Sequence, residues 1–305
     1  MSTASLANYK YAVVAPDGAP ATKANMVRGK PTWCPGCGFY SVLSAFFSMI
    51  EEKKLPRNKI VCVAGIGCSS RFPYFVNAYG VHFIHGRALP FATGLALSRP
   101  DLHVFVFSGD GDAFSIGGNH FHHSARRNVN LTLVVMDNNI YGLTKKQTSP
   151  TTPKGCVTTT DPFGVQERQI NAMQHILTSG ATFVARSAAH QPKHVKDMLT
   201  LAHDHQGFSV IETLCECRNF MKGQFDSTDP KKDGLFKTIP DTHDVSNINA
   251  AIAFAEENSP GYFGLFYNVR QPTRNELESD LIRSEQAKHN QPVKALMKEL
   301  LTVED

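Results

Sequence analysis

Two stretches indicate the fold: residues 103–112, HVFVFSGDGD, and residues 131–139, LTLVVMDNN. Each begins with a run of apolar residues, which is typical of a strand covered on both faces of a parallel sheet. Each run ends in a turn of glycine or polar residues. We expect a helix between them, over residues 116–127. The pair therefore predicts a strand–helix–strand unit of an α/β fold.

The same alternation continues on both sides of this unit. The stretches KIVCVAG, TFVARS and FSVIETL predict three more buried strands, and helical spacing predicts helices over residues 38–54 and 193–205. Strands alternating with helices predict a doubly wound, mostly parallel sheet, whose ligands bind at the carboxyl ends of the strands. The turns to inspect therefore follow Val63, Phe107, Met136 and Leu214.

The chain divides into three segments by composition. Residues 1–30 are polar and predict an N-terminal arm, and residues 31–219 carry the strand–helix pattern. Residues 220–305 are polar and punctuated by glycine and proline at first, and they predict a C-terminal extension that packs on the domain or on a partner subunit. We expect a helix near residues 293–301.

Bulk composition is that of a globular protein of 305 residues, with 42% hydrophobic and 19% charged residues. The net charge of +4 is modest and scattered, so the sequence gives no electrostatic footprint for nucleic acid. Apolar runs fall short of the roughly 18 residues of a membrane helix, and the first residues lack the plan of a signal peptide. We expect a cytoplasmic protein without membrane association.

The turn SGDGD suits a diphosphate, because backbone N–H groups and a helix N-terminus can face the anion. The Asp110 carboxylate would repel a diphosphate unless a divalent cation lies between them, so Asp110 indicates Mg²⁺. Asn138 follows the next strand, with 26 residues between it and Gly111. Its side chain and the backbone carbonyl of Ile140 are hard oxygen ligands that complete the protein part of a magnesium site.

Seven cysteines in a sequence without secretory features favour ligands or reactive thiols over disulfides. Cys34 and Cys37 form a Cys-x-x-Cys pair, Cys68 follows the first buried strand, and Cys217 follows the strand FSVIETL. Turns at one edge of the sheet can bring four thiolates together. Such a set fits either structural zinc or a [4Fe–4S] cluster, and spacing alone does not decide between them.

The motif GDG, followed at this distance by NN, resembles the signature of thiamine diphosphate enzymes. From Trp33 to about Cys217 the chain resembles the β subunit of 2-oxoacid:ferredoxin oxidoreductases, most closely the 2-oxoglutarate type. The resemblance implies a thiamine diphosphate-binding domain, Mg²⁺ and a [4Fe–4S] cluster. It assigns to the cluster Cys34, Cys37, Cys68 and Cys217. Relatives commonly have Ser-Pro-Cys where this chain has Cys215-Glu216-Cys217, so Cys215 is the alternative fourth ligand.

By register with the family, Leu143 borders the substrate and Lys145 reaches it as a cation near the keto oxygen that becomes anionic. His85 lies near the cofactor, where it can donate or move protons, so the resemblance implies His85 and Lys145 as catalytic residues. The resemblance also implies a set of cofactor-binding residues: Ile66, Ser69, His85, Gly86, Arg87, Gly109, Asp110, Gly111, Asp112, Asn138, Ile140, Tyr141, Gly142, Leu143 and Thr144. Cys62 lies inside a predicted strand and is interpreted as a buried small hydrophobe. No role is assigned to Cys156.

The family places the glutamate that activates thiamine diphosphate on a separate pyrimidine-binding domain, and by this resemblance we expect the present chain to carry only the diphosphate-binding half. The resemblance therefore implies an α subunit that carries that domain, a dimer of such heterodimers, and a reaction of a 2-oxoacid with coenzyme A that passes electrons to ferredoxin, potentially reversible as reductive carboxylation. Two alternatives stay open: a cluster-free thiamine diphosphate decarboxylase subunit, and a non-catalytic iron–sulfur electron-transfer subunit.

Overall fold

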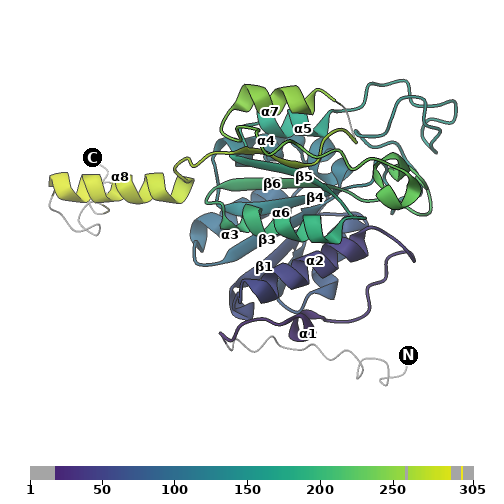
Figure 1. Cartoon of the computed structure of the whole chain (residues 1–305). Coiled ribbons are helices and arrows are strands. Elements are labelled where there is room, and N and C mark those ends of the chain that lie inside the picture. Colours follow the sequence, from purple (N-terminus) through teal and green to yellow (C-terminus); the bar gives the residue numbers. More distant parts are fainter. Residues whose placement is uncertain (1–17, 258–259, 290–296, 298–305) are drawn as a thin grey trace, which may run out of the picture.

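A seven-stranded sheet forms the centre of the computed structural model, which describes residues 18–257, 260–289 and 297 (Figure 1). The strand order is β2-β1-β3-β4-β6-β5-β7. Six strands run parallel, and β7 pairs antiparallel with β5 at one edge. The strands are β1 (Ile60–Ala64), β2 (Tyr79–His82), β3 (His103–Ser108), β4 (Leu131–Asp137), β5 (Phe183–Ala188), β6 (Phe208–Leu214) and β7 (Gly264–Asn268). The predicted α/β class and mostly parallel sheet are confirmed.

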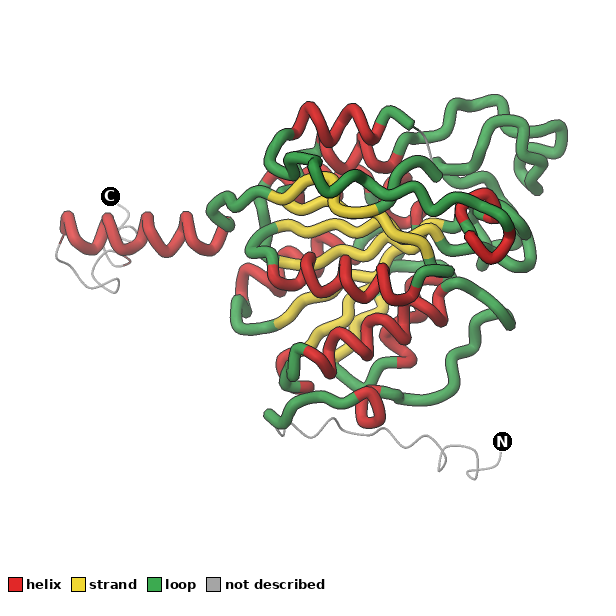
Figure 2. Tube along the Cα trace, viewed as in Figure 1, coloured by secondary structure: helices red, strands yellow, loops and turns green. Residues whose placement is uncertain are grey.

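Helices cover both faces of the sheet, as the doubly wound prediction requires (Figure 2). One core packs α1 (Lys23–Met26), α2 (Phe39–Glu52) and α6 (Pro192–Asp204) against the sheet. A second core on the opposite face contains α3 (Ala88–Ser98), α4 (Gly118–Arg126), α5 (Ala172–Thr178) and α7 (Ile248–Ala255). Strands β1, β3, β4, β5 and β6 therefore lie between two apolar layers. This burial explains their continuous apolar sequences.

The helix after β3 begins later than the sequence predicts. Residues Gly111–Ile116 form a π-helical turn, and α4 begins at Gly118. Glycines at 117 and 118, with their high conformational freedom, lie at the change from one helical winding to the other. The carboxyl end of β3 therefore meets a wide turn, and such π turns are frequent at functional sites.

The segments outside the parallel strands attach to the same body. Val27 pairs with Val76, and Ala21 donates its backbone N–H to Leu55 at 2.8 Å, so the described part of the N-terminal segment lies along the domain. From the C-terminal segment, β7 completes the sheet and α8 (Arg274–His289) projects from the body (Figure 1). The helix predicted near residues 293–301 lies outside the described residues apart from Met297.

None of the helices in the described ranges combines the length and the apolar character that a membrane crossing requires.

Candidate cofactor and thiol site

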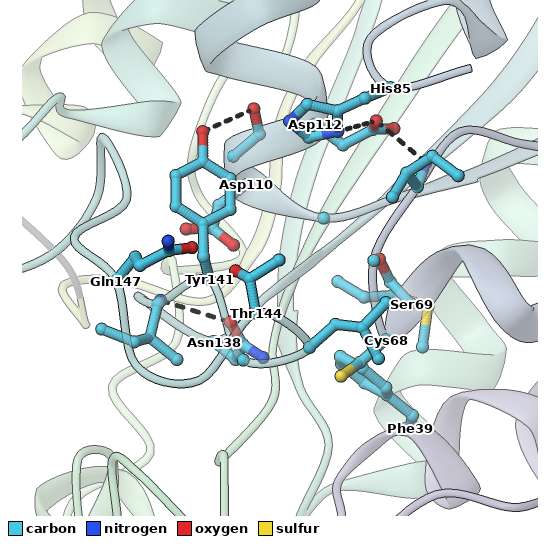
Figure 3. Close-up of a pocket in the computed structure, with 18 residues that line it drawn as sticks. Phe39, Cys68, Ser69, His85, Asp110, Asp112, Asn138, Tyr141, Thr144 and Gln147 are labelled. Atoms are coloured by element: carbon cyan, nitrogen blue, oxygen red, sulfur yellow. Dashed lines mark hydrogen bonds and ion pairs between the residues drawn. The ribbon is translucent and has the colours of Figure 1, made fainter. Parts of the chain in front are cut away.

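The loops after β1, β3 and β4 enclose a cavity of about 350 Å³ (Figure 3). These are three of the four turns that the strand pattern indicates. Most of the predicted cofactor residues line this cavity: Ile66, Ser69, His85, Gly109, Asp110, Gly111, Asp112, Asn138, Ile140, Tyr141, Gly142, Leu143 and Thr144. Cys68, predicted as a cluster ligand, also lines it, together with four residues that the sequence did not suggest: Phe39, Gly67, Met136 and Gln147. The carboxyl ends of neighbouring parallel strands therefore converge on one site.

Gly86 and Arg87 support this cavity without lining it. The backbone N–H of Gly86 donates to Asp112 Oδ1 at 2.7 Å, and a Cβ on Gly86, where φ is +69°, would lie 2.6 Å from Ile116. The Arg87 guanidinium donates to the carbonyls of Gly86 and Ile116 at 3.3 and 3.4 Å. Both residues hold the loop after β2 against the π turn.

Gly111 allows the GDG turn to contact the loop after β4. A Cβ at this position would lie 2.1 Å from Cε1 of Tyr141. The Tyr141 hydroxyl donates to the Gly111 carbonyl at 3.3 Å, so the ring lies flat along the turn. A glycine turn beside a helix start fits a diphosphate, since backbone N–H groups stay accessible there.

Asp110 is 2% exposed, and burial raises the pKa of its carboxyl, while hydroxyls of Ser149 and Thr151 act in the opposite direction. Burial raises the pKa of the neighbouring Asp137 well above its usual range, and the charges of Asp110 and Glu212 raise it further. This concentration of buried negative charge fits a divalent cation at Asp110.

Asn138 lines the same cavity as Asp110, and its Oδ1 accepts a hydrogen bond from the backbone N–H of Ile140 at 3.3 Å. Asn139 between them has a φ of +55°, which turns the chain back at this point. The carboxylate, the amide and the Ile140 segment thus offer oxygen atoms on one side of the cavity. These donors fit Mg²⁺.

Asp112 lines the cavity and also holds three neighbouring groups by hydrogen bonds. It accepts hydrogen bonds from Nδ1 of His85 at 2.8 Å, from the backbone N–H of Ile66 at 3.1 Å and from Oγ of Ser108 at 2.6 Å. The hydrogen bond to Asp112 raises the pKa of His85, although burial acts against it. His85 therefore lies beside the Tyr141 ring, and the Asp112 carboxylate favours its charged form.

A second cavity of about 130 Å³ adjoins the first and is lined by Cys34, Cys37, Cys68 and Cys217. Phe39, Cys68, Asn138, Gly142 and Leu143 line both cavities. A Cβ on Gly142 would lie 3.7 Å from the Sγ atoms of both Cys68 and Cys217. The two cavities therefore share a wall at Gly142.

Burial raises the pKa of Cys37 to about 12; the backbone N–H of Phe39 lowers it, and the thiols of Cys68, Cys217 and Cys34 raise it. Burial likewise raises the pKa of Cys68 to about 11, with Cys217 and Cys34 contributing. Thiolates this close need a positive metal centre. Within the described ranges, no three His, Cys, Asp or Glu side chains are placed to hold one metal ion. Four thiols around one cavity fit either a single zinc ion or an iron–sulfur cluster.

The neighbouring cysteines differ in their surroundings. Cys217 lines the thiol cavity, whereas Cys215 is fully buried, and its backbone would contact a Cβ on Gly38 at 3.1 Å. Cys62 is buried within β1, as the sequence interpretation has it. Cys156 lies 3.8 Å from the Met221 sulfur and away from both cavities.

Lys145 lines the thiol cavity and not the cofactor cavity. It and Lys146 have φ values of +77° and +71°, a strained pair for non-glycine residues. The Thr159 hydroxyl donates to both lysine carbonyls, at 3.2 and 3.0 Å, and stabilises this turn. Leu143, which is 44% exposed, lines both cavities.

Some residues at the site were missed by sequence reasoning. Thr151 bridges Asp110 and Asp137 from below the cavity, and Thr152 donates to the Asn139 carbonyl at 2.6 Å. The indole N–H of Trp33 donates to the Cys68 carbonyl at 2.7 Å. The polar run SPTT beside the DNN turn was the only signal for the threonines, and its burial is not readable from composition.

These features define a diphosphate-binding domain of the thiamine type. Residues 65–213 match the family described as thiamine pyrophosphate enzyme, C-terminal TPP binding domain. The chain is 40% identical, over 247 residues that cover 77% of it and 81% of the relative, to the 2-oxoacid:ferredoxin oxidoreductase subunit beta of Saccharolobus solfataricus. It belongs to the family of 2-oxoacid:ferredoxin oxidoreductase β subunits.

Relatives of the 2-oxoglutarate type are also similar. The 2-oxoglutarate oxidoreductase subunit KorB of Mycobacterium tuberculosis is 47% identical over 68% of this chain, and the match spans 55% of that relative's length. A solved structure of 2-oxoglutarate:ferredoxin oxidoreductase from Magnetococcus marinus, with 2-oxoglutarate, coenzyme A and succinyl-CoA bound, aligns with a TM-score of 0.85 and 38% identity. That alignment covers 93% of this chain and 97% of the solved chain.

Proposed function

We propose that this chain is the β subunit of a 2-oxoglutarate:ferredoxin oxidoreductase. Such an enzyme converts a 2-oxoacid and coenzyme A to acyl-CoA and CO₂, and passes two electrons singly through a [4Fe–4S] cluster to ferredoxin. Coupled to a low-potential ferredoxin, the reaction is open to reversal as reductive carboxylation. The observation that carries the proposal is the wall at Gly142 shared by the cofactor cavity and the thiol cavity.

Thiamine diphosphate, when bound, supplies the carbon nucleophile for the keto group and the electron sink for loss of CO₂. Asp110, Asn138 and the Ile140 carbonyl are proposed to hold Mg²⁺ against its diphosphate. Gly109 and Gly111 keep the backbone of the turn open to the anion. Burial of Asp110 and the absence of space for a Cβ at Gly111 support these assignments.

His85 and Lys145 are proposed as the catalytic side chains of this subunit. His85 holds a proton at Nδ1 against Asp112, which leaves Nε2 to donate to or accept from a group in the cavity. Leu143 borders both cavities, so its side chain limits the volume open to the substrate. Lys145 offers a cation toward the carboxylate of the 2-oxoacid, and its place at the thiol cavity adds positive charge near the cluster ligands.

The thiols of Cys34, Cys37, Cys68 and Cys217 are proposed as the cluster ligands. One-electron steps need an acceptor close to the reacting carbon, and Cys68 lines both cavities. The four thiols that line one cavity, next to the cofactor cavity, support a cluster.

The activating glutamate is proposed to come from an α subunit that carries the pyrimidine-binding domain, in a dimer of heterodimers. The two carboxylates that line the cofactor cavity, Asp110 and Asp112, both belong to the diphosphate turn. None of the described lining residues therefore offers a carboxylate with a proposed role at a pyrimidine ring, which supports this division. The three segments proposed here are an arm at 1–30, the diphosphate domain at 31–219 and an extension at 220–305.

The test is anaerobic purification of the chain with and without its α subunit, followed by metal analysis and an assay of coenzyme A-dependent reduction of a one-electron dye by several 2-oxoacids. The proposal expects iron and thiamine diphosphate in the complex, 2-oxoglutarate as the preferred substrate, and no turnover by the isolated chain. Zinc in place of iron, or full activity without the α subunit, would contradict it.

A further inference from the structure

Thr151 lies between two buried strand-end carboxylates. Its hydroxyl is 2.7 Å from Oδ2 of Asp110, at the turn after β3, and 3.0 Å from Oδ1 of Asp137, the last residue of β4. All three side chains are buried, and Thr151 itself is 3% exposed. The residue reaches this position from a loop 41 residues beyond Asp110 in the chain.

A hydroxyl carries one proton, which Thr151 shares between the two carboxylates, with the shorter distance to Asp110. Asp137 Oδ1 already accepts from the backbone N–H of Asn139 at 2.8 Å and from the Asn139 amide at 3.1 Å. Asp137 therefore fixes the start of the DNN turn, while the Thr151 hydroxyl fixes one oxygen of Asp110. One side chain thus couples the two turns that carry the proposed magnesium ligands.

The segment around Thr151 is rigid enough to act as a support. Thr152 donates to the Asn139 carbonyl at 2.6 Å and accepts from the backbone N–H of Ser149 at 2.8 Å. The backbone N–H of Ile170 donates to the Pro150 carbonyl at 2.8 Å. Ser149 and Thr152 are buried with Thr151, so this segment is held by hydrogen bonds inside the protein next to the turns after β3 and β4.

We propose that Thr151 is a positioning residue that orients the Asp110 carboxylate for the divalent cation by bridging it to Asp137. The proposal rests on the assignment of Asp110 as a magnesium ligand. Groups that hydrogen-bond to a metal ligand fix its orientation, and removing them typically weakens metal affinity by about 10- to 100-fold. We expect a loss in that range when the hydroxyl is removed.

The experiment uses the anaerobically prepared complex with its α subunit, stripped of cation. Mn²⁺ replaces Mg²⁺ so that electron paramagnetic resonance measures cation affinity directly, in the presence of saturating thiamine diphosphate. Thr151→Val removes the hydroxyl and keeps the shape of the side chain, while Thr151→Ser restores the hydroxyl. The proposal expects weaker Mn²⁺ binding in Thr151→Val and near wild-type binding in Thr151→Ser.

The matched control is Thr182→Val. The Thr182 hydroxyl is also buried and donates to Asn128 at 2.8 Å, but it lies at the amino end of β5, away from the cavity. We expect removal of the Thr182 hydroxyl to lower the free energy of unfolding and to leave the Mn²⁺ affinity unchanged. If Thr151→Val does not fold, Thr151→Ala removes the same hydroxyl and leaves space for relaxation.

The outcomes separate this inference from the proposed function. Mn²⁺ binding that is equally strong in wild type and in the variants lacking the hydroxyl overturns the role of Thr151 and leaves the proposed function standing. A wild-type complex that binds neither Mn²⁺ nor thiamine diphosphate overturns both. An equal fall in Thr151→Val and Thr182→Val assigns the effect to general stability and overturns the positioning role.

Discussion

The carboxylate of Asp112 accepts a hydrogen bond from Nδ1 of His85 at 2.8 Å, and the same oxygen accepts the backbone N–H of Gly86 at 2.7 Å. A single oxygen therefore holds both the imidazole and the loop that carries it. The second oxygen, Oδ2, accepts from Ser108 at the end of β3. Asp112 thus links the orientation of His85 to the turn that carries Asp110.

We predict that Asp112→Asn lowers the pKa of His85. The hydrogen bond to Asp112 is the main cause of the raised pKa, and an amide does not supply the negative charge. Titration of the histidine ring signals by NMR measures the shift. His194, whose pKa burial lowers, should titrate as before. A His85 titration unchanged by the substitution would contradict the assigned cause.

The same pair predicts a pH dependence of stability. Because the folded pKa of His85 is raised, its protonation stabilises the fold fully below the unfolded pKa of about 6.5, and this contribution is lost as pH rises through the folded value. The difference in unfolding free energy between wild type and Asp112→Asn should therefore shrink as the pH is raised through the folded pKa of His85. Denaturant unfolding at a series of pH values measures it.

We predict that Gly111→Ala abolishes binding of thiamine diphosphate. The new methyl group would lie 2.1 Å from the Tyr141 ring, so the ring or the GDG turn must move. Gly94→Ala is the control: a Cβ there meets nothing within 4 Å, and its place in α3 makes alanine more stable by up to about 1 kcal/mol. Calorimetric titration of the cofactor compares the two. Normal binding by Gly111→Ala would show that this turn does not contact the diphosphate.

The parallel strands were predictable because burial on both faces favours apolar residues at consecutive positions. Strands β1, β3, β4, β5 and β6 all contain such runs, although Arg186 interrupts β5 and Glu212 interrupts β6. The edge strands were missed for the corresponding reason. Residues of β2 are exposed or half-buried, and its sequence YGVH has no apolar run. Strand β7 contains the short run Leu265–Tyr267, but only Phe266 in it is buried, and it lies in the segment predicted as a C-terminal extension. A run of apolar residues identifies a strand only where other parts of the protein cover both of its faces.

Motif residues at strand ends were likewise predictable, since the carboxyl ends of parallel strands meet. Asp110, Asn138 and Cys68 required only this rule. Thr151 was not predictable, because its contact with Asp110 spans 41 residues through an irregular loop. The choice between Cys215 and Cys217 also depends on three-dimensional position: the first packs into the core, and the second lines the thiol cavity.

We predict that Cys217→Ala loses the cluster and Cys215→Ala keeps it. Cys217 shares the thiol cavity with Cys34, Cys37 and Cys68, whereas Cys215 is buried among apolar side chains, where burial raises the pKa of its thiol well above the usual range. Iron and sulfide analysis of anaerobically purified protein, with absorption near 400 nm, compares the two. Loss of iron in Cys215→Ala but not in Cys217→Ala would contradict the prediction and make Cys215 the fourth cluster ligand.

Arg186 and Glu212 form an ion pair within the sheet, at the paired positions of β5 and β6, with Nε and Oε2 separated by 2.6 Å. Both side chains are fully buried. The Arg186 guanidinium also donates to the Pro260 carbonyl at 3.0 Å, which ties the chain before β7 to the sheet. The charge of Glu212 also raises the pKa of Asp137, the last residue of β4, which pairs with β6.

We predict that Glu212→Gln lowers the free energy of unfolding by about 3–5 kcal/mol, because it leaves the Arg186 charge buried without its partner. Replacing both residues by apolar ones, Arg186→Met with Glu212→Leu, should recover most of that loss, since no buried charge remains. Asp280→Asn is the control, because its pair with Arg283 is largely exposed and contributes little. Denaturant unfolding compares the variants. A loss for Glu212→Gln no larger than that for Asp280→Asn would mean that water or a rearranged neighbour satisfies Arg186 within the sheet.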